Sequence, residues 1–91
     1  MRLRYRVEAA ADLEAIHSYI ESENQAAAAD VVMRIRPAVN RLSLFPKSGR
    51  NGLVPGTREL VVPNLPYIVV YRIVDDFVDV IAVAHAARDR T

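Results

Sequence analysis

The spacing of the hydrophobic residues changes near residue 8, and this change separates a predicted strand from a predicted helix. Residues 2–7 (RLRYRV) alternate strictly between arginine and an apolar side chain, which is the period of a strand with one buried face. From Ala9 onward, apolar residues recur every three or four positions and acidic residues lie between them, as in an amphipathic helix. The pattern therefore predicts a strand with guanidinium groups on one face, followed by a helix whose exposed face is acidic.

A second, longer helix is predicted after Asn24. The Asn24 side chain can cap this helix, and strong helix formers follow it, then an apolar stripe that ends at Leu42. Pro37 interrupts the stripe, but the stripe continues in register beyond it, so we expect a kink, with a break as the alternative. The connection at residues 22–24 is so short that the two helices should form an antiparallel hairpin.

Three strands are predicted after the one long irregular stretch, residues 45–56 (FPKSGRNGLVPG). Residues 58–62, 67–74 and 77–84 are rich in Val, Ile and Tyr, and residues typical of turns separate them. Their short connections predict an antiparallel meander. The last two strands are apolar at both alternating positions, so we expect them at the centre of the sheet.

Together these elements predict an α+β fold of order β-α-α-β-β-β, with the helical hairpin packed on one face of an antiparallel sheet. Because an up-and-down hairpin returns the chain to the end it left, strand 58–62 is expected to run antiparallel to strand 2–7. No repeat or linker divides the sequence, so residues 1–91 are expected to form a single domain. The sheet face that the helices leave open, or a sheet edge, is where we expect a partner.

Composition excludes several classes of protein. The chain is 52% hydrophobic and 25% charged, with no cysteine and two histidines, which is typical of a globular domain without disulfides and leaves too few ligands for a closed zinc site. No nucleotide- or cofactor-binding motif is present, so we expect neither a metal nor a cofactor. No apolar run approaches the ~20 residues that span a bilayer, and we expect a cytoplasmic protein without membrane contact.

The charge distribution is more informative than the net charge of +1, which gives no bulk electrostatic case for binding nucleic acid. Of the twelve Lys and Arg residues, only Lys47 is a lysine. The planar, permanently charged arginine side chain suits carboxylates and phosphates, so this bias fits an interaction surface. High genomic GC content would produce the same bias, and both explanations stay open.

Polar residues near the strand ends are the candidates for catalysis. Cleavage of RNA without a metal needs a base, an acid and cations on the phosphate. A carboxylate or an imidazole could serve as base or acid, and arginines could hold the phosphate. The candidates are Arg58, Glu59, Arg72, His85 and Arg88, which lie beside Lys47 and Arg50.

The same residues also have a structural interpretation, and spacing alone does not exclude it. Glu59 points to the opposite side of its strand from Arg58 and can simply pair with a neighbouring arginine. His85 has the parity of Phe77 and can be a packing residue at a strand end. The acids at positions 75, 76 and 79 are interpreted as turn and solvent-facing residues, although Asp79 also shares the parity of Phe77.

Six short segments follow one another along nearly the whole chain: residues 11–16 (ADLEAI), 19–20 (YI), 42–50 (LSLFPKSGR), 58–62 (RELVV), 66–72 (PYIVVYR) and 85–88 (HAAR). No single segment is specific, but their order and spacing are. Together they resemble the ParE branch of the RelE/ParE toxins, and the predicted order of elements is the order that this family has.

The resemblance implies a toxin of a type II toxin–antitoxin pair, held inactive in a hetero-oligomer by a cognate antitoxin, ParD-like or other. ParE-like toxins act on DNA gyrase, whereas RelE-like toxins cut messenger RNA on the ribosome. RelE-like nucleases usually carry an arginine where this chain has Ile68. The resemblance therefore favours a non-enzymatic gyrase inhibitor, with a RelE-like metal-independent endoribonuclease, or an inactive relative that only binds its antitoxin, as alternatives.

Under the favoured interpretation no residue is catalytic. Only if the protein is a ribonuclease are catalytic residues expected, and they would then be Arg58, Glu59, Arg72, His85 and Arg88. An antitoxin segment can lie beside the helical hairpin or add to a sheet edge. The residues expected to bind antitoxin or target are Arg2, Arg4, Arg6, Arg58, Arg72, His85, Arg88 and Arg90.

Overall fold

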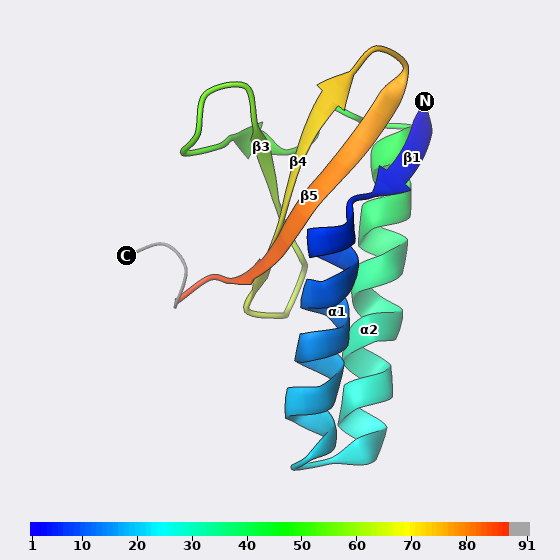
Figure 1. Cartoon of the computed structure of the whole chain (residues 1–91), viewed down its shortest axis with the longest axis vertical. Coiled ribbons are helices and arrows are strands. Elements are labelled where there is room, and N and C mark those ends of the chain that lie inside the picture. Colours follow the sequence, from blue (N-terminus) through cyan, green and yellow to red (C-terminus); the bar gives the residue numbers. More distant parts are fainter. Residues whose placement is uncertain (88–91) are drawn as a thin grey trace.

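In the computed structural model, which describes residues 1–87, a helical hairpin packs on one face of a five-stranded sheet (Figure 1). This arrangement confirms the α+β fold and adds a two-residue strand, β2, inside the stretch expected to be irregular. The elements in chain order are β1 (Arg2–Tyr5), α1 (Val7–Glu21), α2 (Gln25–Asn40), the 3-10 turn η1 (Arg41–Ser43), β2 (Arg50–Asn51), β3 (Arg58–Val61), β4 (Tyr67–Val74) and β5 (Phe77–His85).

The two helices follow the local chemistry of the sequence. The Asn24 side-chain oxygen accepts a hydrogen bond from the Ala27 N–H at 3.0 Å, so the predicted cap at the start of α2 is present. α2 continues through Pro37 without a break. Pro37 and Met33 both lie on the exposed side of α2, so water is available to the Met33 carbonyl, which loses its helical donor. In the part of the chain that the structure describes, neither helix is long and apolar enough to cross a membrane.

The sheet is mixed rather than wholly antiparallel. Its strand order is β1-β5-β4-β3-β2, and β1 pairs in parallel with β5 while the other neighbours pair antiparallel. β3 therefore runs in the same direction as β1, and the expected antiparallel relation between them is wrong. The reason is the short strand β2, which is the first strand after the hairpin. β2 runs antiparallel to β1, as the hairpin geometry requires, and the next turn reverses the chain into β3.

A bulge in β5 reverses the alternation of its side chains between the two faces of the sheet. Tyr71 pairs with Val80, but the preceding residue, Val70, pairs with Ala82, so Ile81 is an extra residue. Before the bulge, alternate residues such as Asp79 face away from the helices. After it, the alternation is reversed, so His85 faces the helices and does not share the side of Phe77, contrary to the parity expected from the sequence.

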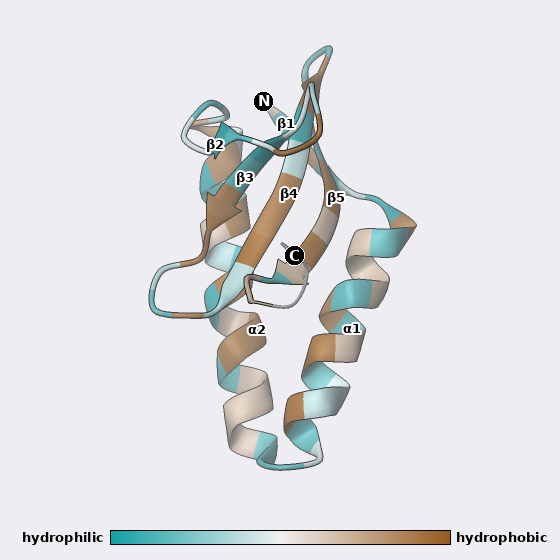
Figure 2. Ribbon diagram, turned by 90° about the vertical axis from the view of Figure 1, so that its left-hand side faces the viewer, coloured by the Kyte–Doolittle hydropathy of each residue, from teal (hydrophilic) through white to brown (hydrophobic). Residues whose placement is uncertain are grey.

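The main core lies between the hairpin and the sheet. Leu13 and Ile35 of the helices pack with Val69 and Val80 of the central strands, and Figure 2 colours the apolar residues of β4 and β5 brown. A smaller cluster around Tyr71 sits under the loop that follows α2. β4 and β5 are central, as their apolar sequences predict. The halves of α1 and α2 nearest their connection extend past the sheet (Figure 1).

Candidate functional site on the open face of the sheet

The face of the sheet opposite the helices carries a group of arginines around one buried carboxylate. Arg4 Nε lies 3.1 Å from Asp79 Oδ1, and Arg6 Nη1 lies 3.3 Å from Asp79 Oδ2. Arg72 Nε of the neighbouring strand lies 3.7 Å from the same Oδ2 atom. The Asp79 side chain is only 1% exposed, whereas each of the three arginines is about half exposed. We call these four residues the Asp79 cluster.

The backbone register explains how the Asp79 cluster forms. Arg4 pairs with Asp79 across β1 and β5, and Arg72 pairs with Asp79 across β4 and β5. Side chains of directly paired residues point to the same face of a sheet. The strict alternation in residues 2–7 then places Leu3 and Tyr5 against the core while the arginines stay on the open face. The predicted division of this strand into a core face and a guanidinium face is confirmed.

The electrostatics of the Asp79 cluster leave a positive surface. Burial alone would raise the pKa of Asp79, but the hydrogen bonds and charges of Arg4 and Arg6 outweigh it and hold that pKa below its ordinary value. Asp79 therefore carries its negative charge at neutral pH. Three guanidinium charges then face one carboxylate, which leaves a surplus of two positive charges on half-exposed side chains.

Apolar side chains lie beside this positive surface. The Phe77 ring lies 4.5 Å from Arg4 Cζ and 5.9 Å from Arg2 Cζ, measured to the ring centroid, so both guanidiniums lie against an aromatic face. The pairing of β4 with β5 places small and branched apolar residues further along the same face. They are Val70, Ala82 and Ala84, whereas Val74 lies opposite Phe77 at the end that carries the arginines. A cationic end beside an apolar strip is a surface suited to a macromolecular partner.

Glu59, a candidate acid or base, is a second buried carboxylate on this face and is tied into the β2–β3 hairpin. Arg50 Nη2 lies 3.3 Å from Glu59 Oε1, and the Leu53 N–H donates to Oε2 at 3.3 Å. The side chain is about 7% exposed. These contacts fit the structural interpretation, in which Glu59 pairs with a neighbouring arginine.

Arg58 and His85 lie on the other face of the sheet. Arg58 Nη1 donates to the carbonyl oxygen of Gly49 at 2.9 Å and thereby holds the loop before β2. The His85 ring meets the Tyr67 ring edge-on, with centroids 5.6 Å apart, and His85 Nδ1 accepts a hydrogen bond from the Ala87 N–H at 3.2 Å. His85 also lines a hollow of about 480 Å³ beside α1, together with Asp12, Ile16 and Tyr19.

The structure does not bring the candidate ribonuclease residues together. His85 pairs with Tyr67, whereas Arg58 pairs with Tyr71. Four residues of strand separate these levels, or roughly 13 Å at the usual rise of a strand. Arg72 lies on the open face, opposite Arg58 and His85. Arg88 and Arg90 lie outside the described residues, and within residues 1–87 no group of His, Asp and Glu could hold a metal ion.

Asp79 is the residue that sequence reasoning misplaced. Its position in a run of acids indicates a turn or a solvent-facing residue, yet it is among the most completely buried side chains of the chain. The signal that could have found it is its parity with Phe77 inside a strand. That signal becomes useful only with the pairing of β1 and β5, since the partners Arg4 and Arg6 are more than seventy residues away in the sequence.

Comparisons with known proteins agree with this architecture. The family of ParE toxins of the type II toxin–antitoxin system parDE matches residues 3–90. This chain belongs to the ParE toxin family. A relative in Sinorhizobium fredii, the toxin candidate Y4kP, is 46% identical over 85 residues, which cover 93% of this chain and 88% of Y4kP. Toxin RelE2 of Caulobacter vibrioides is 40% identical over 81 residues, which cover 88% of this chain and 89% of that toxin.

A solved structure shows that the ParE-family fold extends over nearly the whole chain. A chain of the chromosomal ParDE toxin–antitoxin system from P. aeruginosa superposes with a TM-score of 0.87 at 26% identity, covering 93% of this chain and 95% of that one. The matching family is that of ParE, whereas one relative is named RelE2, so these names do not distinguish the two targets. For this ParE-family toxin, the choice depends on the chemistry of its own surface.

Proposed function

We propose that this ParE-family toxin acts by binding and trapping DNA gyrase, and that a cognate antitoxin neutralises it. The observation that carries the proposal is the Asp79 cluster, where half-exposed arginines lie next to an apolar strip on the face that the hairpin leaves open. Such a surface suits a large, complementary protein partner, because arginine and aromatic side chains, here Phe77, are enriched at protein interfaces, and arginine is enriched among the residues that carry most of the binding energy.

Catalysis is the less favoured mechanism for this surface. General acid–base chemistry needs the acid, the base and the phosphate-binding cations around one reacting atom. Glu59 is tied to Arg50 and to the Leu53 backbone, and His85 packs on Tyr67 on the other face. The position at which RelE-like nucleases usually carry an arginine is Ile68, which is buried. The described residues therefore offer a docking surface with no assembled acid–base pair.

The family and its ParDE neighbour support an antitoxin as the other partner. Two parts of the toxin suit an antitoxin segment. The hairpin exposes apolar side chains, including Tyr19 at 62% and Met33 at 71% exposure, and an amphipathic segment could cover them. β1 is an edge strand, so an extended segment could add to it. An acidic antitoxin would also be attracted to the arginines of β1.

The proposal is tested by adding purified toxin to bacterial gyrase in a DNA supercoiling assay, with and without the antitoxin encoded beside it. We expect the toxin to inhibit supercoiling and the antitoxin to restore it. Arg72→Gln and Arg2→Gln should each weaken inhibition several-fold, because they remove charge from the open face. Arg34→Gln is the matched control, since Arg34 is a helix-surface residue paired with Asp30.

Two results would contradict the proposal and separate its alternatives. Cleavage of transcripts, alone or on ribosomes, with supercoiling unaffected, would identify a ribonuclease. Binding of the antitoxin with neither activity would identify an inactive relative. If the control weakens inhibition as much as the open-face variants do, the assignment of the open face is wrong even where gyrase is the target.

A further inference from the structure

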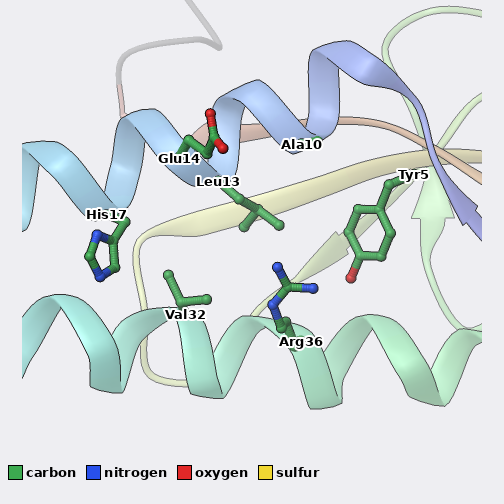
Figure 3. Close-up of a pocket in the computed structure, with 7 residues that line it drawn as sticks. All are labelled: Tyr5, Ala10, Leu13, Glu14, His17, Val32 and Arg36. Atoms are coloured by element: carbon green, nitrogen blue, oxygen red, sulfur yellow. The ribbon is translucent and has the colours of Figure 1, made fainter.

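A second site lies between the two helices, away from the open face of the sheet. The groove where α1 and α2 diverge near β1 encloses a hollow of about 410 Å³. Figure 3 shows apolar side chains from both helices inside it, with a tyrosine from β1 at one end. The lining residues are Tyr5, Ala10, Leu13, Glu14, His17, Val32 and Arg36.

The Tyr5 hydroxyl in this groove has no hydrogen-bond partner. Among the residues that the structure describes, it is the one buried side-chain polar atom left without a partner. A buried hydroxyl without a partner destabilises the folded chain, and such groups are rare enough in native structures that each one calls for an explanation, of which a bound partner is one. Burial raises the pKa of Tyr5, although the charge of Arg36 acts in the opposite direction, so the hydroxyl keeps its proton and can donate it.

Arg36 supplies a positive charge beside this hydroxyl. Its Cζ atom lies 5.8 Å from the centroid of the Tyr5 ring, and Figure 3 shows the guanidinium beside the phenol. Arg36 forms no salt bridge within residues 1–87, whereas Arg34, two residues earlier on α2, is paired with Asp30 at 3.1 Å. Glu14 lines the same groove, but its carboxylate points away from Arg36 in Figure 3.

These observations specify the chemistry of an occupant. A buried O–H donor and a guanidinium without a salt bridge lie side by side at one end of the hollow, and a carboxylate that reached between them would satisfy both. Ala10, Leu13 and Val32 supply the apolar part of the lining and can pack an apolar side chain, while Glu14 and His17 of α1 complete the lining with polar groups. A segment with a carboxylate one helical turn from an apolar residue matches both parts.

We propose that the Tyr5–Arg36 groove is a carboxylate-recognition site for the antitoxin, whose acidic side chain accepts the Tyr5 hydrogen bond and pairs with Arg36. This inference rests on the proposed antitoxin partner. Binding there would also place an antitoxin segment along the hairpin, on a different side of the molecule from the open face of the sheet, which we propose binds gyrase. Neutralisation would then not require the antitoxin to compete for every residue of the open face.

The test measures the affinity of the antitoxin encoded beside the toxin for Tyr5→Phe, Arg36→Gln and the double variant. Each single variant should weaken binding roughly tenfold, the effect of losing one hydrogen bond to a charged group. The double variant should lose less than the product of the two effects, because both groups hold the same carboxylate. Arg34→Gln, on the same helix, should bind like the wild type.

Thermal unfolding of the free variants distinguishes recognition from packing. Tyr5→Phe removes only an unpartnered hydroxyl, so it should leave the melting temperature unchanged or raise it while binding weakens. If the wild-type toxin and both single variants bind the antitoxin equally well, the groove is not the site, although the antitoxin proposal stands. If the wild-type toxin does not bind the antitoxin, the partner itself is wrong, and this inference fails with it.

Discussion

Arg4 and Asp79 are paired residues of two parallel strands, and their side chains meet at 3.1 Å on the sheet face opposite the helices. Asp79 has almost no access to water, so it depends on the arginines for its charge. The arginines keep their outer sides in water and depend much less on Asp79. Because of this asymmetry, the carboxylate serves to hold the arginines in place, and the arginines remain available to a partner.

Replacing Asp79 by asparagine should destabilise the toxin. An asparagine side chain would keep the shape of the aspartate but lose the charge that holds Arg4 and Arg6 together. We expect the free energy of unfolding to fall by about 1–3 kcal/mol, in the range for a buried charge-assisted hydrogen bond. Urea unfolding of Asp79→Asn against wild type measures it.

Asp30→Asn is the control for this prediction, because it breaks an ion pair whose carboxylate is 61% exposed. Surface pairs of this kind contribute at most about 0.5 kcal/mol. Equal losses in the two variants would mean that burial of Asp79 adds nothing to its interactions.

The lowered pKa of Asp79 predicts a dependence of stability on pH. Its pKa in the folded state lies below the unfolded value, so ionised Asp79 stabilises the fold above the unfolded pKa, which is about 3.9 for aspartate. This contribution is lost as the pH falls through the folded pKa. The stability difference between wild type and Asp79→Asn should therefore be full at pH 7 and shrink in acid. Urea unfolding at a series of pH values from neutral to acidic measures it, and a constant difference would contradict the assignment.

Gly49→Ala should destabilise the loop before β2. A Cβ atom at this position would lie 2.6 Å from the Tyr71 hydroxyl oxygen and 2.9 Å from the Glu59 carbonyl oxygen. The Tyr71 hydroxyl cannot move freely, because it donates to the Pro46 carbonyl at 2.6 Å and accepts from the Gly49 N–H at 3.0 Å. We expect a loss of about 1–3 kcal/mol by overpacking, measured by thermal or urea unfolding.

Gly56→Ala separates this steric effect from a backbone effect. Gly56 has a positive φ of 86° and no atom within 4 Å of an added Cβ, so alanine there is strained but does not collide with anything. Its loss should be about 1 kcal/mol, from the left-handed conformation alone. A larger loss at Gly56 than at Gly49 would contradict the crowding argument.

Asn24→Ala should destabilise the start of α2. The Asn24 side chain accepts the Ala27 N–H at 3.0 Å, and no other side chain replaces this cap within the described residues. The usual loss for such a change is about 0.5–2 kcal/mol. Circular dichroism during thermal unfolding measures it. Glu23→Ala, next to the cap on the exposed connection, should have little effect, and an equal effect would argue against capping.

Local chemistry predicted most of the fold. The cap at Asn24, the short helix connection and the apolar runs of β4 and β5 are all signals within a few residues, and the structure confirms what they predict. β2 carries no such signal, because its two residues, Arg50 and Asn51, are polar. Without β2 the direction of β3 cannot be deduced correctly. The bulge at Ile81 also has no local sequence signal, because it arises only from the register between two strands.

The candidate site was predictable only in part, for the same reason. The alternation of Arg2, Arg4 and Arg6 identifies a cationic strand face from a few residues of sequence. The burial of Asp79 follows only from the parallel pairing of the two chain regions. Arg58 and Arg72 are each correctly placed on a strand by the sequence, but the opposite directions of their side chains depend on the register of β3 with β4.

The tip of the hairpin, which extends past the sheet, has no strand beneath it. There α1 and α2 pack mainly on each other through small residues such as Ala28, which is fully buried. In the free toxin this tip should be the first part to open transiently, so its amide protons should exchange sooner and proteases should cut it more readily than the strands. A bound antitoxin lying along the hairpin would slow both processes, which would make the tip a sensitive reporter of neutralisation in the cell.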